Sequence, residues 1–129
     1  MSAIFLSGDL MFGSRVTAAA QATGQTVHTA LSAPRALALL REHPARLLIV
    51  DLHAPGVTIE ELVPAARTIV TDQSVDDPAA VSNTSKLRII AYAPHVHTEL
   101  LARAAAAGCD EVLSQGEFSR SLPRLFATG

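Results

Sequence analysis

The architecture of this chain can be inferred from one segment, Leu47-Leu48-Ile49-Val50-Asp51-Leu52-His53-Ala54-Pro55-Gly56. Four apolar residues run directly into a single carboxylate, and a Pro-Gly turn follows after three more residues. An apolar run of this length between turn residues predicts a strand that is buried on both faces, as in parallel sheets covered by helices. Because ligands bind at the carboxyl ends of such strands, Asp51 is the first candidate for a functional residue.

Length and composition favour a single compact domain over residues 1–129. The chain is 49% hydrophobic and 17% charged, and its net charge of -2 gives no basic surface for nucleic acid or an acidic membrane. A single cysteine, Cys109, excludes an internal disulfide and favours a reducing compartment. No apolar run is long enough to span a membrane, and no basic leader precedes Ile4, so we expect a cytoplasmic protein.

Strand and helix patterns alternate five times along the chain. Helical spacing of apolar residues follows each strand pattern, and Ser32 has the side chain of a helix N-cap. Gly24 and Gly108 stand where helices would end. The alternation predicts an α/β fold with one doubly wound five-stranded parallel sheet and right-handed crossovers. The expected strands cover residues 3–6, 25–30, 47–50, 87–93 and 110–113.

Three features interrupt this regular pattern. Pro64 lies inside an expected helix, which predicts that the helix starts late, near Val63, or kinks. The last helix is expected over about residues 119–127, and Pro123 predicts that its regular part starts late. Residues 71–86 are polar and rich in turn-forming side chains, which predicts a long inserted surface loop.

Two segments carry a resemblance to a known family. Residues 37–44 leading into Leu47–Asp51 and Pro55-Gly56, and the segment Ala106-Ala107-Gly108-Cys109-Asp110-Glu111-Val112-Leu113, resemble the receiver domains of two-component response regulators. The resemblance covers nearly the whole chain. It implies a flavodoxin-like (CheY-like) sheet of strand order 2-1-3-4-5, with Asp51 at the position of the phosphate-accepting aspartate.

The chain departs from the receiver pattern at the other working positions. The family's acidic pair after the first strand, which holds Mg²⁺, is replaced by Ser7-Gly8, and Asp9 follows. Ala93 stands at the hydroxyl position that ends the fourth strand, and Gln115 stands at the lysine position after the fifth. The predicted pocket contains Ser7, Gly8, Asp9, His53, Ala93 and Gln115 around Asp51. Since only Asp9 and Asp51 could hold Mg²⁺ and no lysine supplies a counter-charge, the pattern favours a degenerate or pseudo-receiver.

Other patterns suggest alternatives. His53, His95 and His97 could combine with Asp51 into a metal site at the same edge of the sheet. The spacing Asp51-x-His53-x-x-Gly56 also resembles a cobalamin-binding motif, but in that family the motif follows the first strand of the domain. Cys109 is expected to be a buried thiol, and the glycines do not form a dinucleotide-binding pattern.

The sequence therefore predicts a stand-alone signalling module that binds another protein or itself and is not an enzyme. In the receiver family partners commonly use the face made by helix 4, strand 5 and helix 5. Here that face would carry Glu99, Arg103, Glu111, Arg120 and Arg124. Two alternatives remain, namely a phosphoacceptor in which Asp51 is phosphorylated with help from Mg²⁺, and a small-molecule or metal-binding module.

Overall fold

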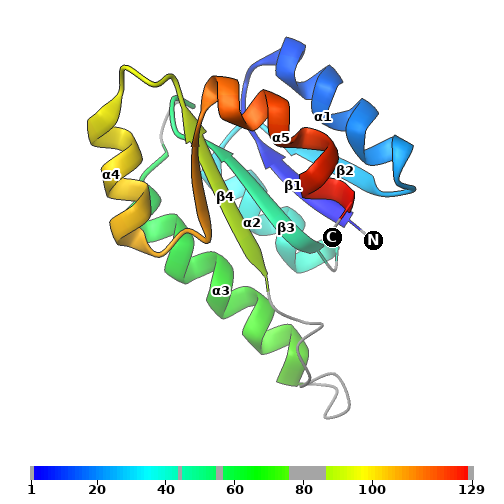
Figure 1. Ribbon diagram of the computed structural model, residues 1–129. Helices are drawn as coiled ribbons and strands as arrows, with labels where there is room; N and C mark the ends of the chain where they lie inside the picture. Colours follow the sequence, from blue (N-terminus) through cyan, green and yellow to red (C-terminus); the bar gives the residue numbers. More distant parts are fainter. Residues whose placement is uncertain (1, 44, 55–56, 76–86, 128–129) are drawn as a thin grey trace.

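A computed structural model describes residues 2–43, 45–54, 57–75 and 87–127 of the chain (Figure 1). Its centre is a single sheet in which every neighbouring pair of strands is parallel, in the order β2-β1-β3-β4-β5. This order confirms the predicted fold. The strands are β1 (Ser2–Leu6), β2 (Thr26–Ala30), β3 (Ala45–Asp51), β4 (Arg88–Ala93) and β5 (Glu111–Ser114).

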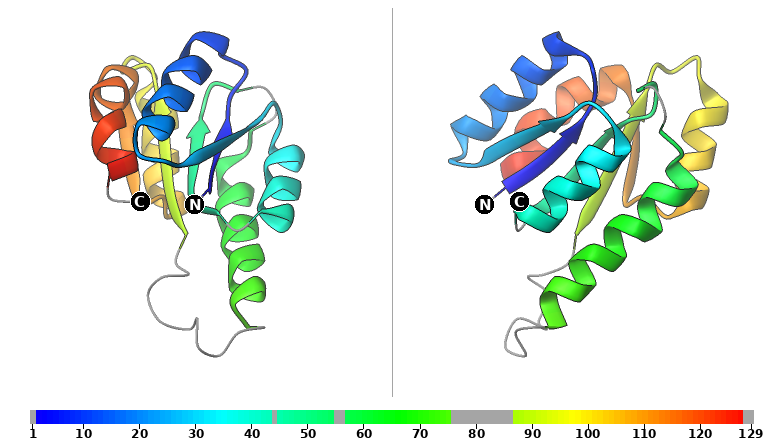
Figure 2. Two further views of the ribbon diagram at one scale, coloured as in Figure 1. Left: turned by 90° about the vertical axis from the view of Figure 1, so that its right-hand side faces the viewer. Right: turned by 180° about the vertical axis from the view of Figure 1, so that it is seen from behind.

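Helices cover both faces of the sheet, as two further views show (Figure 2). They are α1 (Leu10–Ala22), α2 (Ala33–Glu42), α3 (Ile59–Val75), α4 (Thr98–Ala107) and α5 (Gln115–Ala127). Helices α1 and α5 pack on one face of the sheet, and α2, α3 and α4 pack on the other. None of the helices in the described part of the chain has the length and apolarity that crossing a membrane requires.

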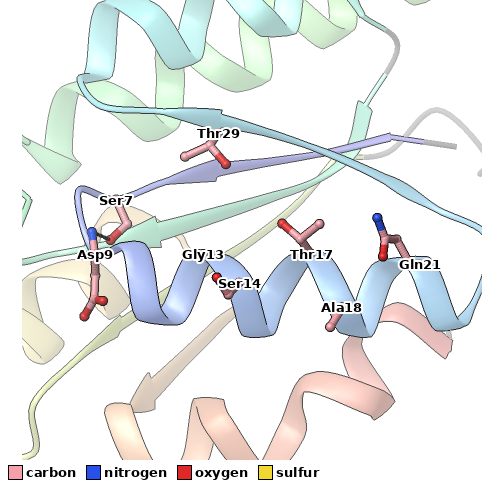
Figure 3. A pocket seen from close by; sticks show the side chains of 8 residues that line it. All are labelled: Ser7, Asp9, Gly13, Ser14, Thr17, Ala18, Gln21 and Thr29. Atoms are coloured by element: carbon pink, nitrogen blue, oxygen red, sulfur yellow. Dashed lines mark hydrogen bonds between the residues drawn. The ribbon is translucent and has the colours of Figure 1, made fainter.

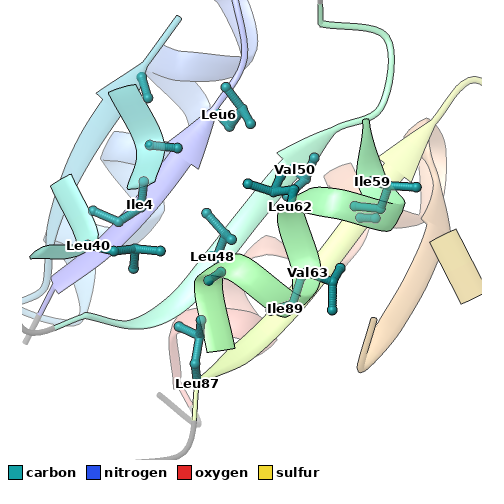
Figure 4. Packing of buried hydrophobic residues seen from close by; sticks show 14 of the residues in the cluster. Ile4, Leu6, Leu40, Leu48, Val50, Ile59, Leu62, Val63, Leu87 and Ile89 are labelled. Atoms are coloured by element: carbon teal, nitrogen blue, oxygen red, sulfur yellow. The ribbon is translucent and has the colours of Figure 1, made fainter. Parts of the chain in front are cut away.

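Alternation along the central strands divides the core between these two faces. Leu48 and Val50 of β3 pack with α2, α3 and α4, in the cluster shown in Figure 4. Leu47 and Ile49 belong to the second cluster, with α1 and α5. Successive side chains of a strand point to opposite faces, so a run of apolar residues supplies both cores at once. The predicted two-sided burial of β3 is confirmed.

Helix boundaries follow the local signals in most places. The Ser32 hydroxyl accepts a hydrogen bond from the Arg35 N–H, which caps α2. Gly24 and Gly108 adopt φ angles of 75° and 100°, a left-handed conformation that residues with a Cβ rarely adopt. Gly108 directly follows α4, and Gly24 follows Thr23, the C-cap residue of α1, so both glycines stand at helix ends as predicted.

The late starts that were expected for the two proline-containing helices are wrong, whereas the alternative for Pro64, a kink in the helix, stays a prediction. Helix α3 begins at Ile59 and contains Pro64, and α5 begins at Gln115 and contains Pro123. Both prolines lie on exposed helix faces, where water can satisfy the carbonyl that loses its helical donor. Burial of apolar side chains on the opposite faces offsets the cost of about 3 kcal/mol per proline.

The expectation of a loop over residues 71–86 is wrong for its first five positions. Helix α3 continues to Val75, so the first five positions of that segment are helical. Residues 76–86 lie outside the described part of the chain. The polar residues of 71–75 therefore extend a helix whose apolar face is already anchored by Leu62, Ala66 and Ile69.

Two histidines from different elements stack near the edge of the sheet. The rings of His28 on β2 and His43 at the end of α2 lie parallel, with centroids 3.9 Å apart. His43 Nε2 also lies 4.0 Å from the Glu42 carboxylate. Burial, followed by the proximity of His43, lowers the pKa of His28 below its ordinary value.

This lowered pKa predicts a loss of stability in mild acid. The unfolded chain binds a proton at His28 more readily than the folded chain, so the free energy of unfolding falls as pH drops through about 6.5. Urea unfolding at pH 8 and pH 5.5 measures the difference. His28→Gln should lose less stability between these values than the wild type, whereas His95→Gln, at an exposed position, should keep the wild-type loss. Equal losses in all three proteins would contradict this assignment.

Candidate functional site

Three polar side chains meet at the carboxyl edge of the sheet. Asp51 is the last residue of β3, Ser7 directly follows β1, and Tyr92 on β4 is the register partner of Asp51. Each is preceded by a residue that packs toward α2, α3 and α4, so by alternation all three point toward α1 and α5. The parallel register thus brings together side chains that are more than forty positions apart in sequence.

Hydrogen bonds hold both oxygens of the Asp51 carboxylate. The Ser7 hydroxyl donates to Oδ2 at 2.8 Å, and the backbone N–H of His53 donates to Oδ1 at 2.9 Å. Ser7 is 1% exposed, and its oxygen also accepts a bond from the Asp9 N–H at 3.0 Å. No Lys or Arg of residues 2–43, 45–54, 57–75 and 87–127 forms an ion pair with Asp51. Its negative charge is therefore held by neutral donors.

Asp9 is used to begin a helix. Its Oδ1 accepts hydrogen bonds from the N–H groups of Met11 and Phe12, at 3.0 and 3.1 Å, as the N-cap of α1. Across the described residues, no three His, Cys, Asp or Glu side chains are grouped so that they could hold a metal ion. The donor set fits Mg²⁺ poorly, because that ion prefers carboxylate oxygens. Of the two carboxylates at this edge, Asp9 caps α1, and the Ser7 hydroxyl is hydrogen bonded both to Asp51 and to the Asp9 N–H.

The other predicted pocket positions bring no charge to Asp51. Ala93 is fully buried and pairs in register with Ser114, the last residue of β5. Ser114 and Glu117 exchange side-chain-to-backbone hydrogen bonds of 2.9 and 3.2 Å, which form a capping box at the start of α5. Gln115, directly after β5, is thereby the first residue of α5, and Gly8 is exposed in the loop between β1 and α1.

Tyr92 is a member of the site that the sequence reasoning did not single out. It is 2% exposed, and its hydroxyl is buried without a hydrogen-bond partner among the described groups. Burial, and next the Asp51 carboxylate, raise its pKa well above the ordinary value. The ring stacks on Phe118 of α5, with centroids 4.2 Å apart. An aromatic residue at the strand end beside Asp51 is the sequence signal that could have identified it.

A groove of about 460 Å³ extends from this edge between α1 and β2 (Figure 3). Ser7 and Asp9 lie at one end, and Gln21 lies at the other. Thr17 and Gln21 point from α1 toward the strand that carries Thr29. The lining is small and polar, and Asp9 is its only charged side chain within the described residues.

Of the three histidines predicted at this edge, the structure brings two together. The ring of His53, after β3, contacts that of His97, at the start of α4, with centroids 4.6 Å apart. His95 lies exposed in the preceding loop. The contact joins the loop after Asp51 to the first turn of α4, and it offers a metal ion two nitrogen ligands at most.

The predicted partner face on α4, β5 and α5 carries charges that are largely paired within the molecule. Glu111 binds Arg88 of β4 and Arg124 of α5, both at 3.0 Å. Arg103 of α4 makes a bidentate pair with Glu60 of α3, at 2.7 and 2.9 Å. Glu99 and Arg120 are exposed and belong to none of these three pairs.

Comparison with solved structures shows the same fold in response regulators. A two-component response regulator from Clostridium difficile matches with a TM-score of 0.73 and 13% identity, covering 99% of this chain and 91% of that one. The chemotaxis response regulator CheY4 of Vibrio cholerae matches with a TM-score of 0.68 and 18% identity, covering 98% and 96%. The receiver domain of NtrX from Brucella abortus gives 0.64 and 16%, covering 98% and 99%.

These matches establish that the chain has the receiver-domain fold over nearly its whole length. At 13–18% identity they speak for the fold alone. No family model matches the sequence, and no curated protein matches it.

The bond between Ser7 and Asp51 predicts a measurable coupling energy. Ser7→Ala should destabilise the protein by about 1–3 kcal/mol, because it leaves the Asp9 N–H and one Asp51 oxygen without their partner. In a double-mutant cycle with Asp51→Ala, urea unfolding should give a coupling of about 1.5–3 kcal/mol.

Ser14→Ala is the matched control, since Ser14 is exposed on α1 and the change should stay within about 0.5 kcal/mol. A coupling near zero between Ser7 and Asp51 would show that their hydrogen bond adds nothing to the fold.

Proposed function

We propose that this chain is a receiver-like signalling module that acts by binding another protein, without phosphoryl transfer. The fold supports the signalling class, because the matching structures are response regulators. The observation that carries the rest is the state of Asp51, whose two oxygens accept bonds from Ser7 and the His53 N–H.

Phosphoryl transfer to a carboxylate requires positive charge where donor and acceptor approach. Mg²⁺ and a lysine supply that charge in receivers, and the positions that would provide them are Ser7 and Gln115 here. Asp9, the remaining carboxylate, is engaged with Met11 and Phe12. A neutral amide at Gln115 can offer one hydrogen bond, at about half the strength of a charge-assisted one.

The same proposal holds that the module is not an enzyme. Hydrolytic or transfer chemistry on a side-chain nucleophile needs a hydroxyl or thiol beside a general base. No Ser, Thr or Cys side chain is hydrogen bonded to a histidine within the described residues. Burial raises the pKa of the Cys109 thiol to about 11, which keeps it protonated and unreactive at neutral pH.

Partner binding through α4, β5 and α5 is part of this proposal. On this face Arg103 pairs with Glu60 and Glu111 pairs with two arginines, so these charged side chains are already held by partners within the molecule. Held charges lose less side-chain freedom on binding than mobile ones. The contact between His53 and His97 connects the loop after Asp51 to α4. This contact gives a change at Asp51 a physical route to α4, which is part of the proposed partner face.

Phosphorylation can be tested directly. Incubated with acetyl phosphate and Mg²⁺, the wild-type protein should show no phosphoryl adduct by intact-mass spectrometry. An NMR titration with Mg²⁺ and then beryllofluoride should leave the Asp51, Asp9 and Gln115 signals unmoved. An adduct that Asp51→Asn abolishes would establish the alternative, a phosphoacceptor with an unusual pocket, and would refute the proposal.

A variant with a carboxylate at position 7 tests whether Ser7 is what excludes Mg²⁺. Ser7→Asp places a second carboxylate against Asp51, so the two charges should lower the melting temperature in metal-free buffer. Millimolar Mg²⁺ should then raise the melting temperature of this variant by several degrees, because the ion binds both carboxylates. Ser7→Asn, which is similar in size but neutral, should show no such rise. If Ser7→Asp is also indifferent to Mg²⁺, Ser7 is not what excludes the metal.

A further inference from the structure

Strand β2 lies at one edge of the sheet and pairs only with β1 among the described strands (Figures 1 and 2). The Ala30 carbonyl faces β1, where it accepts a bond from the Ser7 N–H at 3.0 Å. Backbone groups alternate in direction along a strand, so Val27 and Thr29 point their N–H and C=O groups away from β1. Within the described residues, the outer side of β2 therefore presents backbone donors and acceptors that have no partner.

This edge lacks the features that usually prevent strands from pairing between molecules. The strand Thr26-Val27-His28-Thr29-Ala30 contains no lysine, no proline and no acidic residue, and its pairing with β1 shows no bulge. Leu31, directly after it, is 66% exposed. In the groove beside β2, Asp9 is the only charged side chain within the described residues, and it lies at one end.

We propose that β2 of a second copy of this chain pairs antiparallel with β2 of the first. The two sheets are then joined at this edge and related by a two-fold axis. In this arrangement Val27 of each copy faces Thr29 of the other as a hydrogen-bonded pair, and each pair exchanges both of its bonds. His28 of one copy then lies opposite His28 of the other. Leu31 lies opposite Gln25 of the second copy, which places this exposed apolar side chain against the partner.

A second copy fits this edge better than a charged partner. The pairing is self-complementary, because the same two residues supply donors and acceptors on both sides. No described side chain of the strand carries a fixed charge, so bringing two copies together costs no like-charge repulsion along the seam. Strand β5, with α4 and α5, lies at the opposite edge of the sheet and stays open to another partner. This inference is independent of whether Asp51 accepts a phosphoryl group.

Sedimentation velocity over a range of protein concentrations, together with amide hydrogen exchange by NMR, tests the proposal. Dimer should form as concentration rises, and the Val27 and Thr29 amides should exchange about tenfold more slowly when dimer dominates. Thr29→Lys, which installs the charge that natural edge strands carry, should weaken the dimer about tenfold. Thr98→Lys makes the same change at an exposed position on α4 and should leave the dimer unaffected.

Two results would overturn the proposal. One is a monomer at every concentration, up to the millimolar range. The other is a dimer in which the Val27 and Thr29 amides exchange as fast as in the monomer, or which Thr98→Lys weakens and Thr29→Lys does not. Because circular dichroism and thermal melting of each variant monitor folding, loss of the dimer through unfolding is distinguished from loss of the interface.

Discussion

The hydrogen bond from the Ser7 hydroxyl to Asp51 determines what the carboxyl edge of this sheet can do. The buried Ser7 hydroxyl supplies the Asp51 carboxylate with a strong donor at 2.8 Å. The same oxygen accepts the Asp9 N–H, so one side chain joins β3 to the start of α1. Asp9 then caps that helix. Ser7 thus links the strand ends and the first helix into one network of neutral donors.

The fold could be predicted because its strongest signals are local. The apolar run ending at Asp51 predicts a strand that is buried on both faces, which a parallel sheet between helix layers provides. Gly24 and Gly108 mark helix ends through a conformation that depends on their own backbone. Ser32 caps α2 by a bond to a residue three positions away. Each of these signals depends only on residues a few positions apart, so it can be recognised in the sequence alone.

The site was only partly predictable because its geometry depends on long-range contacts. The sequence placed Ser7, Asp51, Ala93 and Gln115 at one edge, but the capping role of Asp9 and the burial of Tyr92 depend on the assembled packing. The effect of a proline likewise depends on which helix face it occupies, and Pro64 is exposed. The partners of the charged side chains on α4 and β5 could not be predicted either, since Arg103 pairs with Glu60, forty-three positions away.

The position of Tyr92 has a practical consequence. The chain contains one tyrosine and no tryptophan, so all of its tyrosine fluorescence comes from a single ring. That ring stacks against Phe118 of α5 and lies beside the Asp51 carboxylate. A tyrosine's emission is sensitive to the groups around its hydroxyl. The molecule therefore carries an optical reporter at its candidate site, and events there can be followed without attaching a dye.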